Sequence, residues 1–218
     1  MIDFATQRTN MVDSQVRPSD VTDRRILRAM LAIPREIFVP EQVKATAYMD
    51  EHLALGQGGR SMLAPRTFAK LVQLLTIGED DAVLDVGCAT GYSTAVLATL
   101  ARSVVGVEEN AALAQRAQTA LADLGRTNAV IKTGSLTNGA PGEGPFDAIL
   151  VNGCVVDVPD ALLDQLKDGG RLAAVRADGR VGQATVWRRH GTSFDARPAF
   201  DAGAPLLPGF EKRPGFVF

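Results

Sequence analysis

The sequence predicts one α/β fold, with a mostly parallel sheet covered by helices on both faces. Short apolar runs alternate with segments of helical periodicity between residues 65 and 175. Strands that alternate with helices in this way form parallel sheets, which carry helices on both faces. The length of 218 residues suits a single core with a small extension.

The predicted core begins at a helix over Pro65–Leu75, whose apolar side chains share one face, and continues into a buried strand over Ala82–Gly87. The later elements, in order, are a helix at Tyr92–Leu100, a strand at Ser103–Val107, a helix at Ala111–Leu124, a strand at Ala129–Lys132, a strand at Ala148–Val151 within the apolar run Phe146–Asn152, a helix at Pro159–Leu166, a turn at Asp168–Gly170 and a strand at Arg171–Val175. Two antiparallel strands, Thr185–Arg188 and Phe194–Phe200, are expected to close the sheet. Ala204–Gly215 is predicted to be ordered irregular chain that leads into Phe216–Phe218.

A helical extension is predicted before the core. Its first helix carries apolar residues from Ile26 to Ile33, is capped by Thr22 or Asp23, and ends at Pro34. A second helix is expected over Glu41–Tyr48, followed by a glycine-rich loop, Gly56–Pro65. We therefore divide the chain into residues 1–65, the extension with a substrate loop, and residues 66–218, the core with its closing strands.

Composition argues against several classes of partner. Lys and Arg total 23 and Asp and Glu 25, so the net charge of −2 provides no basic field for nucleic acid. No apolar run approaches the roughly 20 residues of a membrane span or forms a signal peptide, which favours a cytoplasmic protein. Cys88 and Cys154 lack the spacing of metal ligands, so neither a metal site nor a disulfide is expected. No particular oligomeric state is predicted.

The segment from Asp85 to Tyr92 has the pattern of a ligand-binding turn. Gly87 and Gly91 lie between a strand and a helix, where backbone can pass close to a ligand at little steric cost. Glu108 ends the next strand, where an acid can accept hydrogen bonds from both hydroxyls of a ribose. The pattern therefore predicts a nucleoside site.

Three nucleotide ligands compete for this turn. A P-loop requires Gly-Lys-Ser/Thr, but Tyr92 and Ser93 follow Gly91. A dinucleotide fingerprint requires Gly-x-Gly-x-x-Gly, and only Gly-x-x-x-Gly is present. S-adenosylmethionine remains, since it has no phosphate and its ammonium suits the Asp85 carboxylate. A glycine turn in an α/β fold that binds no nucleotide stays the alternative.

The candidate cofactor residues follow from this interpretation. Ser135 and Leu136 occupy the place where such folds hold adenine, and Asn152 ends the fourth strand on the ligand side. The complete predicted set is Asp85, Gly87, Cys88, Ala89, Thr90, Gly91, Tyr92, Glu108, Ser135, Leu136 and Asn152.

Most of the chain resembles the protein-L-isoaspartate O-methyltransferase family, in the family's own order. The segments that carry the resemblance are Asn10–Val12 with Gln15–Arg17, Ala29–Pro40, Ala47–Tyr48, Gly56–Pro65, Asp85–Tyr92 and Pro159–Leu172. The Met-x-x-x-Gln-x-Arg and Pro-Arg-x-x-Phe-Val-Pro segments are the most specific. The resemblance implies a Rossmann-like class I methyltransferase that uses S-adenosylmethionine to methylate the isoaspartyl carboxylates of damaged proteins, which would be its partners in protein repair.

One loop departs from the family pattern. The family loop reads Gly-x-Gly-Gln-Thr-Ile-Ser-x-Pro with a catalytic serine, and alignment on Pro65 puts Leu63 at that serine and Ser61 at the threonine. We interpret Ser61 as the candidate catalytic hydroxyl. Arg60 is the candidate partner of an incoming carboxylate, and the alternative for it is a solvated loop arginine. A hydroxyl or amine acceptor would need a base; His52 is the nearby histidine, although a satisfied loop histidine is the favoured interpretation.

Three functions remain open from the sequence. The first is isoaspartyl carboxyl methylation, and the second is methylation of another acceptor by the same fold, which the altered loop would permit. The third is a catalytically silent module that binds the cofactor.

Overall fold

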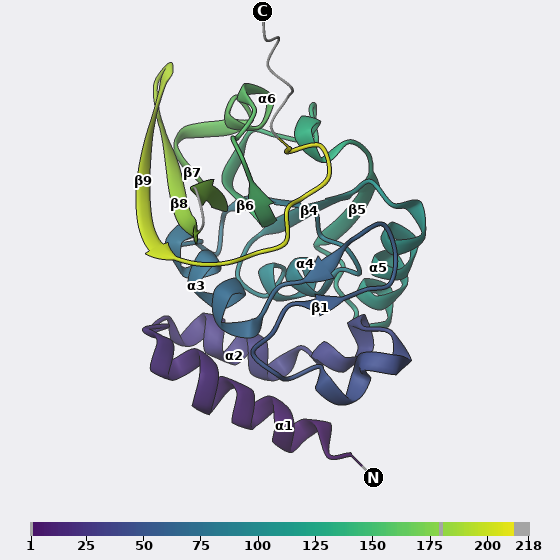
Figure 1. The fold of residues 1–218 in the computed structure, drawn as a ribbon. Coiled ribbons are helices and arrows are strands. Elements are labelled where there is room, and N and C mark those ends of the chain that lie inside the picture. The colour runs from purple at the N-terminus through teal and green to yellow at the C-terminus, as the bar shows by residue number, and fades with distance from the viewer. Residues whose placement is uncertain (1, 179–180, 212–218) are drawn as a thin grey trace, which may run out of the picture.

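A computed structural model describes residues 2–178 and 181–211 of the chain. Its fold is built around a seven-stranded sheet (Figure 1). The strand order is β5-β4-β3-β6-β7-β8-β9, with parallel pairing from β5 to β7 and antiparallel pairing of β7, β8 and β9. The bounds are β3 Ala82–Val86, β4 Ser103–Glu108, β5 Ala129–Thr133, β6 Phe146–Val155, β7 Leu166–Asp178, β8 Val181–His190 and β9 Ser193–Asp201. The predicted fold class, parallel core and closing strands are confirmed.

Helices precede the sheet and connect its strands. The α-helices are α1 Phe4–Met11, α2 Arg24–Ala32, α3 Pro65–Leu75, α4 Tyr92–Leu97, α5 Ala111–Asp123 and α6 Asp160–Leu163. Shorter helical turns are η1 Val12–Val16, η2 Arg17–Ser19, η3 Arg35–Phe38, η4 Glu41–Thr46 and η5 Leu136–Asn138, and a small separate hairpin pairs β1 Leu53–Ala54 with β2 Ser61–Met62. Figure 1 shows α1 and α2 together at one end of the molecule, beyond the β1–β2 hairpin.

The two faces of the sheet are covered by different elements. Neighbouring residues of one strand point to opposite faces and therefore pack in different clusters. On β3, Val83 packs in the cluster that contains the apolar residues of helices α2 to α5, whereas Leu84 and Val86 pack in a second cluster. The second face is covered by the short helix α6, turn η5 and the segment after β9, which contributes Leu207 and Phe210. Irregular chain thus replaces longer helices on the second face.

Several predicted elements are confirmed and others differ. The helix at Pro65–Leu75 has the predicted bounds, and the Asp23 side chain caps α2 by accepting from the backbone N–H of Arg25. The predicted helices at 41–48 and 159–166 are shorter, being the 3-10 turn η4 and the single turn α6. The predicted turn at 168–170 lies inside β7, where pairing shifts between Phe146 and Ala148 of β6.

Helix α1 and the β1–β2 hairpin are among the elements that were not predicted. Helix α1 is polar and buries only Met11 among its residues, so it gives no apolar periodicity. The β1–β2 hairpin lies partly inside the predicted loop, and each of its strands has two residues. The tail from 204 to 211 is irregular apart from a bridge between Leu206 and Cys154, and Phe216–Phe218 lie outside the described residues.

The extension and the core share packing and hydrogen bonds. One cluster of buried apolar residues runs from Met11 to Ala184. The Gln73 side chain of α3 accepts from the backbone N–H groups of Thr22 and Asp23 and donates to the carbonyl of Asp20. The division at residues 65 and 66 stays a prediction about organisation.

Within residues 2–178 and 181–211, none of the helices combines the length and the apolar character needed to cross a bilayer. The same described ranges contain no group of three His, Cys, Asp or Glu side chains placed to hold a metal ion.

Candidate active site

The predicted ligand-binding turn follows β3 at the carboxyl edge of the parallel strands. Gly87 and Gly91 have φ values of 73° and 93°, which residues other than glycine rarely adopt. A Cβ on Gly91 would lie 2.9 Å from the Cβ of Ala117 in α5, so this glycine also allows the turn to pack on that helix. The backbone N–H groups of Gly87 and Cys88 both donate to the Val107 carbonyl, which fixes the turn against β4.

Glu108 lies directly beside this turn, as predicted from its place at the end of β4. Its side chain is fully buried and accepts from the backbone N–H groups of Ala89 at 2.8 Å and Asn110 at 3.1 Å. These bonds aim the carboxylate at the mouth of the turn, where the sequence predicts a ribose.

Arg60 occupies that place in the structure. Its Nη2 lies 3.1 Å from Oε2 of Glu108 and 2.8 Å from the carbonyl oxygen of Gly87, and its Nε lies 3.3 Å from both oxygens of Glu108. The side chains of Arg60 and Glu108 are 2% and 0% exposed. The sequence predicts that Arg60 receives the substrate carboxylate or, as the alternative, that it is a solvated loop arginine. In the structure the guanidinium is instead buried and paired with the carboxylate of Glu108.

Asp85 is also placed differently from the prediction. Its Oδ2 accepts from the hydroxyls of Ser93 at 2.7 Å and Thr94 at 2.6 Å, and its Oδ1 accepts from Nδ2 of Asn152. Both oxygens therefore bind side chains of α4 and β6 rather than facing open space for an ammonium. Burial raises the pKa of Asp85 to about 6 although these three donors favour the charged form.

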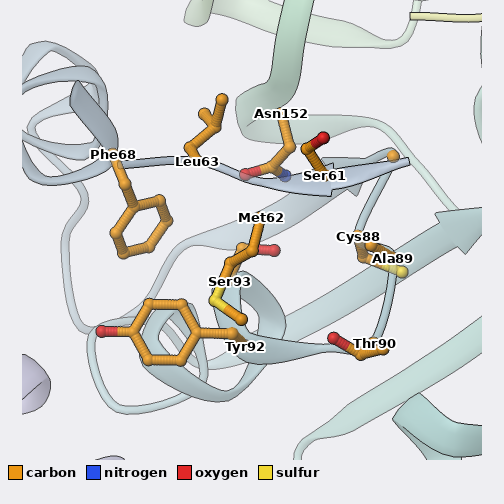
Figure 2. A pocket seen from close by; sticks show the side chains of 11 residues that line it. Ser61, Met62, Leu63, Phe68, Cys88, Ala89, Thr90, Tyr92, Ser93 and Asn152 are labelled. Carbon is orange, nitrogen blue, oxygen red and sulfur yellow. The ribbon is translucent and has the colours of Figure 1, made fainter. Parts of the chain in front are cut away.

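A small pocket gathers much of the predicted site (Figure 2). Its volume is about 20 Å³, room for about one water molecule, whereas small-molecule sites span roughly 300–1,000 Å³. It is lined by Ser61, Met62, Leu63, Phe68, Gly87, Cys88, Ala89, Thr90, Tyr92, Ser93 and Asn152. Seven of the predicted residues are among these, and Ser61 of β2 faces the same pocket as the glycine turn.

Ser135 and Leu136 lie outside this pocket. The exposed Ser135 hydroxyl is 2.9 Å from that of Thr137, and the Leu136 side chain is buried in the second apolar cluster. The structure therefore does not bring the predicted adenine residues into the cavity beside the turn.

Tyr92 and Thr90 connect the turn to the N-terminal extension. The Tyr92 ring packs edge-on against Phe38 and at a tilt against Phe68, with centroids 5.6 and 5.5 Å away. The Thr90 hydroxyl donates to the carbonyl of Phe38 at 2.6 Å. The guanidinium of Arg35 lies 4.9 Å from the centre of the Tyr92 ring. The extension thus packs directly behind the turn.

Arg35 is a buried residue that the site prediction missed. It is 0% exposed and donates to the carbonyls of Ala47 at 2.7 Å and Leu63 at 2.5 Å, so it fixes the end of the loop that carries Arg60 and Ser61. Its signal was the Pro-Arg-x-x-Phe-Val-Pro segment, which indicated the family but not a position under the loop.

The segment after β9 closes the other side of the turn. The backbone of Cys154 donates to the carbonyl of Pro205 and accepts from the N–H of Leu207, at 2.7 and 2.9 Å. A Cβ on Gly87 would lie 3.3 Å from the Leu207 side chain, and one on Gly153 would lie 2.5 Å from it. Glycines at these positions allow Leu207 to pack against the strand ends.

His52 is a satisfied loop histidine, the interpretation favoured from the sequence. Nδ1 accepts from the N–H of Ala64 at 3.1 Å, which leaves the proton on Nε2 to donate to the Gly203 carbonyl at 3.0 Å. Burial lowers the pKa of His52 from its usual 6.5.

We expect the NMR titration midpoint of His52 to lie below pH 6.5. A base whose pKa is lower in the folded state than in the unfolded state binds its proton more readily when unfolded. The stability that neutral His52 contributes is therefore fully present above pH 6.5 and is lost as pH falls. Protonated Nδ1 could no longer accept from Ala64. A midpoint at or above 6.5 would show that the His52 ring is less buried in solution than it is in the structure.

The chain is similar to known proteins over most of its length. A family model described as protein-L-isoaspartate(D-aspartate) O-methyltransferase matches residues 6–192. The chain is 38% identical over 210 residues to a protein-L-isoaspartate O-methyltransferase of Roseiflexus sp., covering 95% of each chain. It is 42% identical over 171 residues to a protein of the same name from Geobacter metallireducens, covering 78% of this chain and 79% of that one.

Solved structures show the same fold. A structure described as a protein-L-isoaspartate O-methyltransferase has a TM-score of 0.82 at 24% identity, over 93% of this chain and 66% of that one. A Plasmodium falciparum structure, described as a putative protein-L-isoaspartate O-methyltransferase in complex with S-adenosyl-L-homocysteine, has a TM-score of 0.78 at 19% identity, over 95% of this chain and 99% of that one.

Proposed function

Because this chain belongs to the protein-L-isoaspartate(D-aspartate) O-methyltransferase family, we propose that it methylates isoaspartyl carboxylates of damaged proteins, with S-adenosylmethionine as methyl donor. The single observation that supports this most strongly is the match of the family model over residues 6–192. The turn after β3 and the acid ending β4 lie together at the carboxyl edge of the sheet, the general ligand edge of such sheets, which agrees with a nucleoside cofactor.

The polar groups beside the turn suit this cofactor, but the cavity there is smaller than the cofactor. Glu108 and the Gly87 carbonyl offer acceptors for two ribose hydroxyls, and the backbone of Gly87 can approach a ligand closely. The cavity of about 20 Å³ is too small for the cofactor, and the side chains of Arg60 and Leu207 pack against Gly87 beside it. We therefore assign no contact to the sulfonium, which supplies the methyl group once the cofactor is bound.

The chemistry agrees with a site that lacks a free base. An aspartyl-type carboxyl has a reference pKa near 3.9, so the acceptor is already ionised at neutral pH. Methyl transfer between an anion and a sulfonium removes charge, and exclusion of water with correct alignment favours it. The apolar lining from Met62, Leu63 and Phe68 would exclude water beside the turn.

The test is methylation of a synthetic peptide that contains one isoaspartyl residue. With cofactor labelled in its methyl group, the ester should release labelled methanol at alkaline pH, and the matched peptide with normal aspartate should release far less. Equal release from the two peptides, or none from either while another acceptor is methylated, would overturn the isoaspartyl assignment.

Leu63 supports a second candidate function. It stands where the family loop has its serine, and its side chain is 3% exposed within the pocket lining. An apolar side chain there favours, as the alternative, a methyltransferase of the same fold with a different acceptor. Restoration of peptide methylation by Leu63→Ser would identify this position as the cause.

Ser61→Ala should lower kcat for the isoaspartyl peptide by about tenfold or more, because loss of one directed hydrogen bond to a charged group costs about 1.5–3 kcal/mol. Affinity for S-adenosylhomocysteine, measured by calorimetry, should stay unchanged. Ser14→Ala is the matched control, since the Ser14 hydroxyl binds the Asn10 carbonyl on the exposed N-terminal helix. An unchanged kcat would remove Ser61 from the catalytic site.

We also propose that residues 1–65 form the substrate-facing extension and that residues 66–218 form the cofactor core. Thr90 of the core donates to the Phe38 carbonyl, and Arg35 donates to the Leu63 carbonyl within the extension, so the extension with its loop lies against the cofactor turn. A cytoplasmic location and the absence of a nucleic-acid partner remain proposals based on composition and charge.

A further inference from the structure

The buried pair of Arg60 and Glu108 uses the acceptors that the ribose of the cofactor would need. A guanidinium presents several N–H donors in a planar fork, and a ribose presents two neighbouring O–H donors. Arg60 directs its donors to both oxygens of Glu108 and to the carbonyl of Gly87. The two groups therefore compete for the same place.

The loop around Arg60 combines a buried side chain with an exposed, glycine-rich tip. Gly56, Gly58 and Gly59 are exposed and have φ values of 73°, 55° and 64°, whereas Arg60 is 3% exposed. The backbone of Arg60 binds only within the loop, by donating to Gln57 and accepting from Leu55, both at 2.9 Å. Withdrawal of the side chain thus need not break the β3–β4 pairing or the core.

The tip also lies over the chain that follows Glu108. A Cβ on Gly58 would lie 3.3 Å from Nδ2 of Asn110, the residue that caps α5. The loop tip therefore lies beside Asn110, two residues after the acid that the Arg60 side chain contacts.

We propose that Arg60 is an internal competitor of the cofactor: its guanidinium holds the ribose acceptors of the free enzyme, and binding requires the Gly56–Arg60 loop to withdraw it. This rests on the proposed use of S-adenosylmethionine. Arg60 then sets cofactor affinity, because an apparent Kd increases as the fraction of competent molecules falls.

The first test is calorimetric binding of S-adenosylhomocysteine to the full chain. Arg60→Ala should tighten the Kd about tenfold or more, the change expected if at most about one tenth of free molecules have the site open. Arg66→Ala is the matched control and should leave the Kd unchanged. Arg66 lies at the start of α3, its side chain is 56% exposed, and it pairs with Asp50. Arg60→Gln, which retains an amide donor, should fall between wild type and Arg60→Ala.

The outcomes separate this inference from the proposed function. Binding by wild type with an equal or weaker affinity in Arg60→Ala would overturn the inference alone, and a weaker affinity would indicate that Arg60 contacts the cofactor. No binding by either protein at millimolar ligand would overturn the cofactor use and the inference together. Binding by Arg60→Ala alone would support both.

Limited proteolysis of the wild-type chain provides a second test that needs no variant. Trypsin cleaves after arginine, and the Arg60–Ser61 bond is shielded while Arg60 is buried. S-adenosylhomocysteine should speed cleavage at this bond, with the products identified by mass spectrometry. Slower cleavage there in the presence of ligand would contradict withdrawal of Arg60.

Discussion

Glu108→Ala should lower the free energy of unfolding by about 3–5 kcal/mol, the typical cost of removing one partner from a buried ion pair. The Arg60 side chain would keep its charge at 2% exposure with only the Gly87 carbonyl as acceptor. The N–H groups of Ala89 and Asn110 would lose their acceptor as well. Denaturant unfolding at neutral pH measures the effect.

Two further variants make this measurement specific. Glu109→Ala changes the neighbouring, exposed acid and should alter stability by less than about 0.5 kcal/mol. The double variant Arg60→Ala/Glu108→Ala should lose clearly less than the sum of the two single losses, because the charges compensate each other. Additive losses would mean that the pair is not formed in solution.

Asp85→Asn should remove about 3 kcal/mol of pH dependence from the stability of the fold. The pKa of Asp85 is raised from 3.8 to about 6, and each pKa unit corresponds to about 1.36 kcal/mol. A carboxyl with a raised folded-state pKa binds its proton more readily when folded, so its ionisation costs stability as pH rises from about 4 through 6. Relative to wild type, the variant should gain stability between pH 4 and pH 7.

The substitution preserves the hydrogen bonds of this site. The amide oxygen can accept from Asn152, and the amide nitrogen can donate to the hydroxyls of Ser93 and Thr94. Asp147→Asn is a control of opposite sign. Burial raises the Asp147 pKa, but Lys167 and a backbone hydrogen bond together outweigh it and lower the pKa, so the stability that ionised Asp147 contributes is lost as pH falls below about 4. If wild type and Asp85→Asn have parallel pH profiles, Asp85 is not a buried titrating group.

The parts of the site that follow from local sequence could be predicted. The strand, turn and following helix from Val83 to Leu97 have distinct apolar patterns, and Glu108 ends a strand whose neighbour in the sheet is fixed by parallel topology. The place of both carboxylates at the ligand edge depends only on these patterns. The partners of each carboxylate depend on more distant segments.

Arg60 and Asn152 illustrate what the pattern could not reveal. Arg60 pairs with an acid 48 residues away, across a loop whose glycines give no periodicity. Asn152 lines the pocket on the predicted side, but its amide donates to Asp85, 67 residues away, because an ionised buried carboxylate requires donors. Helix α1 was missed because its contacts are polar and distant, such as Arg8 to the Tyr48 hydroxyl at 2.9 Å.

The contact between residues 205–207 and the end of β6 has a consequence for shortened forms of the protein. A chain that ended before residue 204 would retain all seven strands of the sheet, yet Gly153 would lose the Leu207 side chain and the Pro205 carbonyl that pack against it, and Gly87 would be covered by Arg60 without Leu207. Such a form should show a native far-ultraviolet spectrum while its β6 edge exchanges amide hydrogens more quickly. Completion of the sheet and coverage of the carboxyl end of β6 therefore depend on different stretches of this polypeptide.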